Sequence, residues 1–190
     1  MERVELTSAR AANRSFLERV ERQSGVQVED CYQCGKCSAG CPLAFAMDYT
    51  PHQIMRMLQL GLGEEAMKSH TVWLCSGCET CVTRCPREVD VPRVMDVLRM
   101  EAKRAGVVKE KAVDIFYNLF LDSVRKNGRV HEMMLAAWFN LRSGQLFKDV
   151  LLAPVMFLKG KISPFPQKAA PDAVQRIFAK AQVWAGGEKH

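Results

Sequence analysis

The chain has 190 residues, of which 48% are hydrophobic, so it can bury a real core as one domain or as a small domain with a helical extension. The formal net charge is +6, and all of the excess lies in residues 107–190, which carry 13 basic and 7 acidic side chains. Residues 1–25 are rich in Arg and Glu without an apolar core, so we expect no secretory signal and a cytoplasmic protein. The longest apolar run, residues 150–158, is interrupted by Pro154 and is too short to span a bilayer.

Three helices are predicted in the first half of the chain. Apolar side chains at helical spacing predict the first over residues 8–24, with Gly25 as its stop. The second, over residues 50–61, begins with Thr at the cap position, Pro after it and Gln three residues after the Thr. The third begins at Asp90 and ends at Gly106. The side chains expected to face inward are Ala9, Ala12, Phe16, Leu17 and Val20 in the first helix, Ile54, Met57 and Leu58 in the second, and Val94, Val97 and Leu98 in the third.

The second half is predicted to continue with helices. The expected ranges are residues 111–126, 131–141, 146–158 with a kink at its proline, and 172–186, while three prolines exclude regular structure from residues 162–171. The pattern indicates no second core of obvious size. The Phe, Trp and Met side chains of these helices are therefore interpreted either as contact surface for partner proteins or as the ordinary core of a helical bundle.

All eight cysteines lie in two runs with the spacing C-x2-C-x2-C-x3-C-P. Each cysteine of the second run lies 44 positions after its counterpart, and each run is followed by a predicted helix, which indicates a duplicated unit. Bacterial-type ferredoxins hold a pair of 4Fe-4S clusters with this spacing, and the fourth cysteine of each run ligates the other cluster. The resulting assignment is Cys31, Cys34, Cys37 and Cys85 for cluster 1, and Cys75, Cys78, Cys81 and Cys41 for cluster 2.

The linker between the runs decides the fold class. Residues 42–74 contain a strong helix signal and almost no alternation of apolar and polar side chains, so the cluster domain is predicted to be helical. We expect an all-α chain in three parts: an N-terminal helical segment (1–27), a domain with two 4Fe-4S clusters (28–106) and a C-terminal helical extension that docks to other subunits (107–190).

Zinc is the competing metal for the cysteine runs. It prefers two C-x2-C pairs, whereas each run here has four cysteines and ends in Pro, and none of the four histidines lies at a ligand spacing. Lys36, Arg84 and Arg87 lie in or beside the runs, where they either raise the cluster potentials or are simply solvated. Trp73 and Leu74 precede the second run and are expected to shield a cluster from water.

Two other binding functions are not expected. Residues 61–66 match the G-x-G-x-x-A pattern of dinucleotide sites, but they follow a predicted helix instead of a strand and have two glutamates where pyrophosphate would bind. Each cluster with four thiolates has a formal charge of about −2, so two clusters lower the net charge to about +2. The signal for nucleic-acid binding therefore largely disappears, and we expect neither a nucleic-acid partner nor a transmembrane segment.

The paired cysteine runs, the helix over residues 50–61 and the segment over residues 72–81 closely resemble the C subunit of heterodisulfide reductase, and the resemblance covers residues 28–105. It implies an alpha-helical ferredoxin domain with two 4Fe-4S clusters and no catalytic site of its own. In that family the protein passes single electrons from the A subunit, which carries flavin and iron-sulfur clusters, to the B subunit, which reduces a disulfide such as that of coenzyme M and coenzyme B in methanogenesis. The resemblance therefore implies an electron-transfer component of an oxidoreductase complex, assembled as a dimer of heterotrimers or a larger hetero-oligomer.

Two alternatives stay open. Similar helical ferredoxin domains occur in iron-sulfur subunits of membrane-associated dehydrogenases that deliver electrons to quinone, although the plant-type ferredoxin and Cys-Cys-Gly domains common there are absent from this sequence. A zinc-structured binding module for nucleic acid would use the basic second half. Its aromatic residues, however, lie at helical core spacing and are not interleaved with Lys and Arg.

Overall fold

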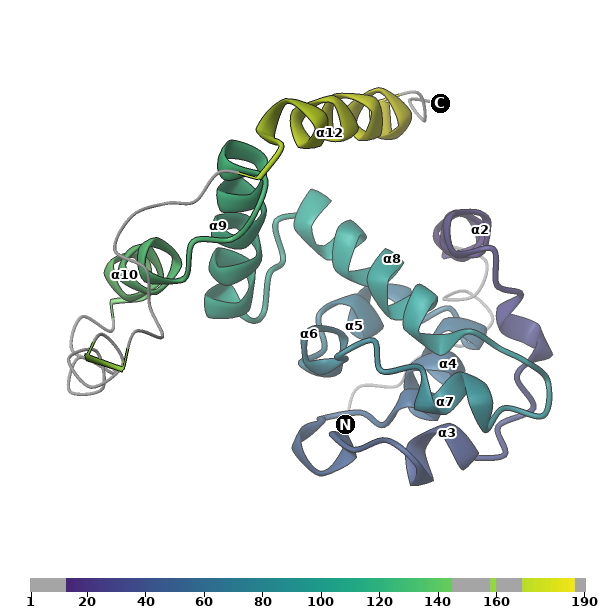
Figure 1. Ribbon diagram of the computed structural model, residues 1–190. Helices are drawn as coiled ribbons and strands as arrows, with labels where there is room; N and C mark the ends of the chain where they lie inside the picture. Colours follow the sequence, from purple (N-terminus) through teal and green to yellow (C-terminus); the bar gives the residue numbers. More distant parts are fainter. Residues whose placement is uncertain (1–12, 145–157, 160–168, 187–190) are drawn as a thin grey trace. The chain divides into compact units, whose positions relative to one another are not determined.

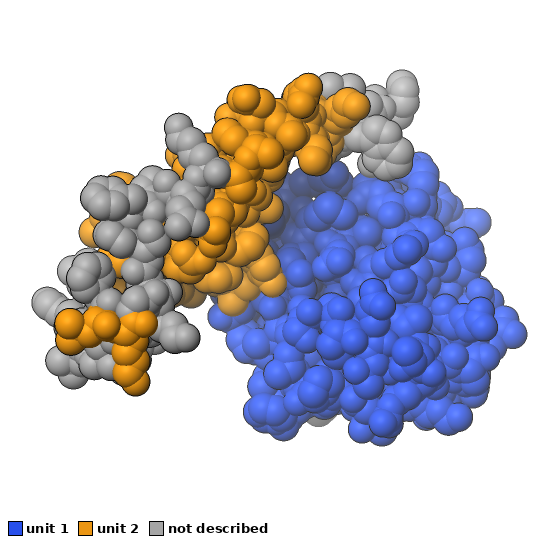
Figure 2. Space-filling model, in the orientation of Figure 1, with its two compact units in different colours: residues 1–110 blue, residues 111–190 orange. Residues whose placement is uncertain are grey.

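Every regular element that the computed structural model describes is helical, and the description covers residues 13–144, 158–159 and 169–186 (Figure 1). The predicted all-α fold class is therefore confirmed. The chain divides into two compact units, residues 1–110 and residues 111–190, which Figure 2 shows in different colours. We call them unit 1 and unit 2, and both cysteine runs lie in unit 1.

Unit 1 is built from a series of mostly short helices. Its elements are α2 Arg14–Ser24, η1 Val28–Asp30, α3 Lys36–Ala39, η2 Ala44–Ala46, α4 Pro51–Gln59, α5 Gly63–Met67, α6 Thr71–Leu74, α7 Thr80–Thr83 and α8 Val91–Arg104. The longest of them, α8, contacts α2, α5, α6 and α7, so it is the element around which unit 1 packs (Figure 1). Because α2 packs on α8, the N-terminal helix belongs to the same compact unit, and the predicted domain boundaries after residues 27 and 106 stay predictions.

The starts of α4 and α8 follow the predicted capping patterns. The side-chain oxygen of Gln53 accepts a hydrogen bond from the backbone N–H of Thr50 at 2.8 Å, which satisfies a donor at the start of α4. At the start of α8 the Asp90 carboxylate accepts from the backbone N–H of Arg93 at 3.2 Å. Both helices have Pro in their first turn, where the missing N–H costs nothing.

Side chains from α4 and α8 form the centre of the unit 1 core. The residues predicted to face inward that are buried are Phe16, Val20, Ile54, Leu58, Val94, Val97 and Leu98. The prediction was wrong for Met57, which is only half-buried, whereas Met55 is completely buried. Since both α3 and α5 contact α4, the buried face of this helix is wider than one stripe and includes Met55. Ala9 and Ala12 lie outside the described residues.

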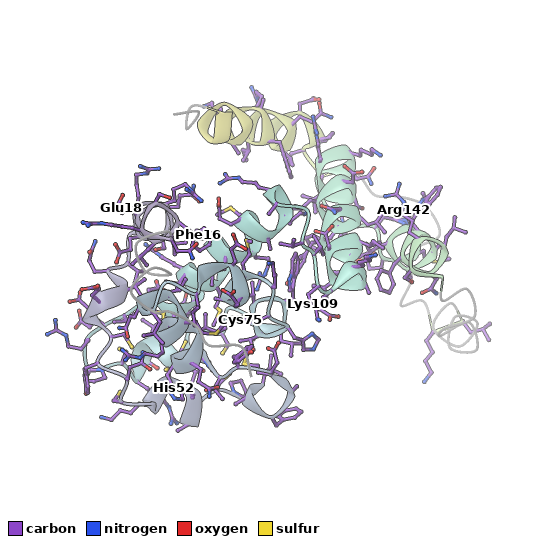
Figure 3. All side chains as sticks on the ribbon, turned by 180° about the vertical axis from the view of Figure 1, so that it is seen from behind. Phe16, Glu18, His52, Cys75, Lys109 and Arg142 are labelled. Carbon is purple, nitrogen blue, oxygen red and sulfur yellow. The ribbon has the colours of Figure 1, made fainter. Side chains whose placement is uncertain are left out.

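The first described helix, α2, buries a narrow stripe of side chains four residues apart, formed by Phe16, Val20 and Ser24. Leu17 lies beside this stripe and is therefore only half-buried. The ring of Phe16, labelled in Figure 3, lies against Gly63 at the start of α5, where a Cβ atom would collide with it. The segment that matched a dinucleotide pattern thus provides a packing contact that requires glycine.

Unit 2 buries little apolar surface within its described residues. Its helices are α9 Lys111–Asn127, α10 Glu132–Ser143 and α12 Pro171–Gly186. Leu119 of α9 is buried, whereas Phe116 and Trp138 are 40% and 45% exposed. The rings of Phe116 and Phe139 meet edge to face, 5.8 Å apart, and join α9 to α10. The exposed side chains favour the contact-surface interpretation of this half over that of a bundle core.

Some predictions for the second half fall on residues that the structure does not describe. The kinked helix over residues 146–158 lies there except for its last residue, as does most of the proline-rich stretch. The last helix begins at Pro171, one residue before the predicted start, because proline fits the first position of a helix. No helix within the described ranges is long and apolar enough to cross a membrane.

Candidate iron-sulfur site

The two cysteine runs have the same backbone conformation 44 residues apart, as the predicted duplication requires. Gly35 and Glu79 have φ angles of 75° and 59°, and each precedes a one-turn helix, α3 or α7. Two residues earlier, Gln33 and Gly77 both have a φ of 64°. A left-handed backbone is unfavourable for Gln and Glu, and such residues concentrate where a loop is shaped around a ligand. The duplicated loops therefore have the form of paired binding sites.

Cysteines from both runs line one cavity in unit 1. Its thiols are those of Cys41, Cys75, Cys78 and Cys81, and its apolar lining consists of Leu43, Met47, Pro51, Val91, Pro92 and Met95. The cavity thus brings together the four side chains that the crossed assignment gives to cluster 2. Its apolar walls come from η2, α4 and α8 and their flanking residues, whereas Ser76, Glu79 and Thr80 add polar groups to the lining and Cys78 is exposed.

The remaining cysteines lie around the first run. The thiol of Cys37 is influenced electrostatically by Cys31 and Cys34, and burial raises its pKa. Tyr32 also has a raised pKa, first because of desolvation and then because of Cys34 and Cys85, so Cys85 of the second run reaches the first. These four cysteines are the predicted ligands of cluster 1. None of the eight cysteines forms a disulfide.

The two sets of thiols lie beside each other, because α3 and α7, which follow the first two cysteines of each run, pack together. Burial, followed by the influence of Cys75 and then of Cys37, raises the pKa of the Cys81 thiol to about 11. Burial also raises the pKa of Cys75, whereas hydrogen bonding with Thr80 lowers that of Cys78. Without metal the buried thiols hold their protons at neutral pH, and iron displaces these protons on binding.

Hydrogen-bond donors near the sulfur atoms supply the stabilisation that thiolates need in a buried site. The backbone N–H of Val89 donates to Cys85 Sγ at 3.3 Å. The side-chain amide of Gln33 donates to Cys31 Sγ at 3.4 Å. Such bonds stabilise the negative charge of an iron-thiolate cluster and adjust its potential. Eight sulfur ligands in two adjacent sets, left-handed loops and donors aimed at sulfur together fit a pair of 4Fe-4S clusters.

Two long side chains hold the backbone of the runs, and neither of them was expected from the sequence pattern. The amide of Gln59, the last residue of α4, donates to the carbonyl oxygens of Cys31 at 2.7 Å and Val28 at 3.0 Å. In the second run, the carbonyl oxygens at the same two positions accept from the guanidinium of Arg99 on α8, at 2.9 Å and 2.8 Å. Gln59 and Arg99 are 40 residues apart instead of 44, so aligning the repeats does not pair them.

A second group of contacts supports the linker between the runs. The carboxylate of Asp48 accepts from the backbone N–H groups of His70 at 2.7 Å and Thr71 at 2.9 Å, and from the Thr71 hydroxyl at 2.7 Å. Although desolvation by itself raises the pKa of Asp48, these hydrogen bonds outweigh it and lower the pKa. His52, labelled in Figure 3, forms a 2.7 Å hydrogen bond between its Nδ1 and the hydroxyl of Ser38, the residue after Cys37.

Arg84, Arg87 and Trp73 were predicted from the sequence to lie near the clusters, and the structure gives the contacts or burial of each. Arg87 pairs with Asp30 at 3.1 Å, and both side chains are about half exposed. The side chain of Arg84 lies over Gly40, where a Cβ atom would be 2.6 Å from Arg84 Cδ. Trp73 is 3% exposed, as shielding a cluster from water would require, but that role stays a prediction.

These features define the class of protein. A family model described as a 4Fe-4S dicluster domain matches residues 27–89, a range that includes both cysteine runs. Unit 1 is therefore an all-α iron-sulfur domain that binds two 4Fe-4S clusters, and the match favours iron over the zinc alternative.

Named relatives show a more particular similarity over part of the chain. Over 106 residues the chain is 36% identical to the C subunit of the H2:CoB-CoM heterodisulfide,ferredoxin reductase of Methanothermobacter marburgensis, covering 55% of this chain and 57% of the relative. It is 41% identical over 86 residues to the iron-sulfur C subunit of the CoB-CoM heterodisulfide reductase of Methanopyrus kandleri, covering 45% of each chain. A protein of Archaeoglobus profundus described as similar to the heterodisulfide reductase C subunit is 37% identical over 91 residues, which cover 47% of this chain and 48% of that protein.

The predicted resemblance to the C subunit of heterodisulfide reductase is thus confirmed over the matched part of the chain. The chain spans about half the length of the curated relatives it matches, from 45% to 57% in these three.

Proposed function

We propose that this chain is the electron-relay component of a heterodisulfide-reductase-like complex and contains no catalytic site of its own. It receives electrons from an A subunit that carries flavin and iron-sulfur clusters, and it passes them to a B subunit that reduces a disulfide. The observation that carries the proposal is the cavity in which Cys41 of the first run joins Cys75, Cys78 and Cys81 of the second. The relatives named as C subunits support the choice of complex.

The roles of the chain's residues follow from the site. We assign Cys31, Cys34, Cys37 and Cys85 to cluster 1, and Cys75, Cys78, Cys81 and Cys41 to cluster 2. When bound, the clusters supply one-electron chemistry, since each accepts and releases a single electron. The left-handed loops hold the thiolates, apolar side chains form one wall of the cluster 2 cavity, and the donors from Val89 and Gln33 stabilise negative charge at the sulfur atoms of cluster 1. Because each set takes its fourth cysteine from the other run, the protein holds the two electron sites together.

Unit 2 is proposed to dock the chain to its partners. Its described helices expose apolar side chains, among them Phe116 and Trp138, and residues 107–190 carry 13 basic and 7 acidic side chains. Protein interfaces are enriched in aromatic residues and Met at their centre and in polar residues at their rim. The complex is proposed to be a cytoplasmic hetero-oligomer of the A and B subunits and this chain.

A reconstitution experiment tests this function. The full-length chain, purified anaerobically with about eight irons, is mixed with separately purified A and B subunits of a heterodisulfide reductase. The A subunit is reduced, and the rate at which the disulfide substrate of the B subunit is consumed is measured. We expect a rate that depends on the amount of this chain added. A rate that is equally high without the chain would contradict the relay.

The matched control carries Cys37→Ser and Cys81→Ser, which remove one ligand from each set. This variant is expected to bind the A and B subunits in a pull-down and to lose the relay. A pull-down that instead recovers a membrane cytochrome, together with quinone reduction, would favour the membrane-associated dehydrogenase. Zinc in place of iron after anaerobic purification would contradict both electron-transfer functions.

A further inference from the structure

In the two halves of unit 1, equivalent backbone carbonyl groups are bound by side chains of different charge. The side-chain amide of Gln59 binds the carbonyl of Cys31 at 2.7 Å, and the guanidinium of Arg99 binds the carbonyl of Cys75 at 2.9 Å. Each of the two side chains also binds the carbonyl three residues earlier. The geometry of the two halves is therefore alike, but a neutral amide supports the first run and a cation supports the second.

The position of Arg99 makes its charge effective. Its side chain is only 17% exposed, so water screens the charge less than it screens a surface cation. The guanidinium lies within electrostatic reach of the Cys75 thiol as well as binding the carbonyl of that residue. A positive charge in this place stabilises added negative charge at the ligands of cluster 2.

Other charges near the runs are more exposed. Asp96 accepts a 3.1 Å hydrogen bond from Arg99, but its side chain is 64% exposed, so it offsets the guanidinium charge only in part. Near the first run, Arg56 donates to Gln59 at 3.2 Å from an exposed position. Arg87 is 55% exposed and paired with Asp30. Solvent screening weakens these charges relative to that of Arg99.

We infer that Arg99 is a positioning residue that also raises the reduction potential of cluster 2. Its charge favours the residence of a single added electron on cluster 2, against the hydrogen bonds that Val89 and Gln33 donate to sulfur ligands of cluster 1. This inference rests on the presence of two clusters and on Cys75 as a ligand of one of them. It does not depend on which partner protein supplies or accepts the electron.

The test is a potentiometric titration of the full-length holoprotein, followed anaerobically by low-temperature EPR. The Cys78→Ser variant changes a ligand of cluster 2 and identifies the signal that belongs to this cluster. In Arg99→Gln, which copies the neutral group of the first run, we expect the preference of the electron for cluster 2 to fall about tenfold, equivalent to about 59 mV for a one-electron couple. An Arg99→Gln protein with full iron content and unchanged potentials would overturn the inference.

Three further variants separate charge from structure. Arg99→Lys keeps the charge and loses the paired hydrogen bonds, so it should stay closer to the wild-type potential than Arg99→Gln. An equal fall in the cluster 2 potential of Arg99→Lys and Arg99→Gln would show that the charge of Arg99 does not raise this potential. Gln59→Arg should raise the potential of cluster 1, and Asp96→Asn should raise that of cluster 2 by less than Arg99→Gln lowers it. If Arg99→Gln loses iron, Gln59→Arg and Asp96→Asn become the test. Unchanged reduction potentials in both variants would then overturn the inference.

Discussion

Unit 1 and unit 2 use their apolar side chains in opposite ways. In unit 1, Ile54 of α4 and Leu98 of α8 are completely buried. In the described part of unit 2, Leu119 is 9% exposed and Leu141 is 57% exposed. The difference teaches that unit 1 is stabilised from within, by a core and by the ligands of its clusters, whereas unit 2 presents apolar surface that another molecule can cover. Four predictions test this comparison, in decreasing order of expected effect.

The largest effect is expected from loss of a cluster ligand in unit 1. Cys41→Ser and Cys75→Ser should affect the same cluster although they lie in different runs, and each should lower the iron content from about eight toward about four. Cys85→Ser should affect the other cluster. Iron analysis and EPR of anaerobically purified protein measure this. If Cys41→Ser and Cys31→Ser gave the same spectrum, the crossed assignment would be wrong.

The second-largest effect is expected from a substitution in the core of unit 1, and the same kind of substitution in unit 2 should have a much smaller effect on stability. Leu98→Ala removes a completely buried side chain of α8, so the free energy of unfolding should fall by about 2–5 kcal/mol. The matched control in unit 2 is Leu141→Ala, which should change it by no more than about 0.5 kcal/mol. Anaerobic urea unfolding followed by circular dichroism measures both. Similar losses in the two variants would show that unit 2 depends on its apolar side chains as unit 1 does.

The third prediction concerns the linker contacts of Asp48. Asp48→Ala leaves the N–H groups of His70 and Thr71 without their carboxylate partner, so we expect a loss of about 1–2 kcal/mol in the free energy of unfolding. The pKa of Asp48 is lowered in the folded protein, so its contribution is fully present above the unfolded carboxyl pKa of about 3.9 and is lost as the pH falls through the folded pKa.

Urea unfolding of wild type and Asp48→Ala at several pH values tests whether the stabilisation by Asp48 is lost as the pH falls. The difference between them should be constant from about pH 5 to 8 and should shrink in more acidic solution. A difference that grows as the pH falls would contradict the assigned hydrogen bonds. Asp122→Ala in unit 2 is the control, since that carboxylate lies on the surface and its ion pair with Lys126 is 4.0 Å long.

The smallest effect is expected at the surface of α2. Glu18 pairs with Arg14 at 3.1 Å, but the two side chains are 61% and 81% exposed. Exposed pairs contribute little because water screens them, so Glu18→Gln should change the free energy of unfolding by no more than about 0.5 kcal/mol. A loss comparable to that of Asp48→Ala would show that this exposed pair within α2 contributes far more than solvent screening allows.

Local patterns in the sequence predicted the starts of α4 and α8 well, whereas the division of the cysteines into two sets stays a prediction. Thr50 with Gln53, and Asp90 with its following Pro, mark helix starts because a helix end needs specific donors and acceptors within a few residues. The inward face of α4 was predicted less well. Met55 and Met57 are equally apolar, and which of them is buried depends on α3 and α5, which pack on α4 from other parts of the chain.

The contacts that support the site could not be predicted in this way. The sequence pattern predicts only a solvated charged residue at Arg99, on the outer face of a helix, and a solvated polar residue at Gln59, near a helix end. Both bind carbonyl groups 24 to 31 residues away in the sequence, so only the folded chain brings the partners together. Asp48 and the N–H groups that it binds are likewise 22 and 23 residues apart.

The contact between Gly40 and Arg84 has a genetic consequence. Gly40 belongs to the first run and Arg84 to the second, and the long side chain fills the space that a Cβ atom at Gly40 would need. A Gly40→Ala substitution should therefore be accommodated by movement of the exposed Arg84 side chain in the opposite half of the repeat, so its effect should disappear in an Arg84→Ser background. Positions 40 and 84 are equivalent in the repeat, so a second copy of the second run in place of the first would put an arginine at position 40, in the space that Arg84 fills.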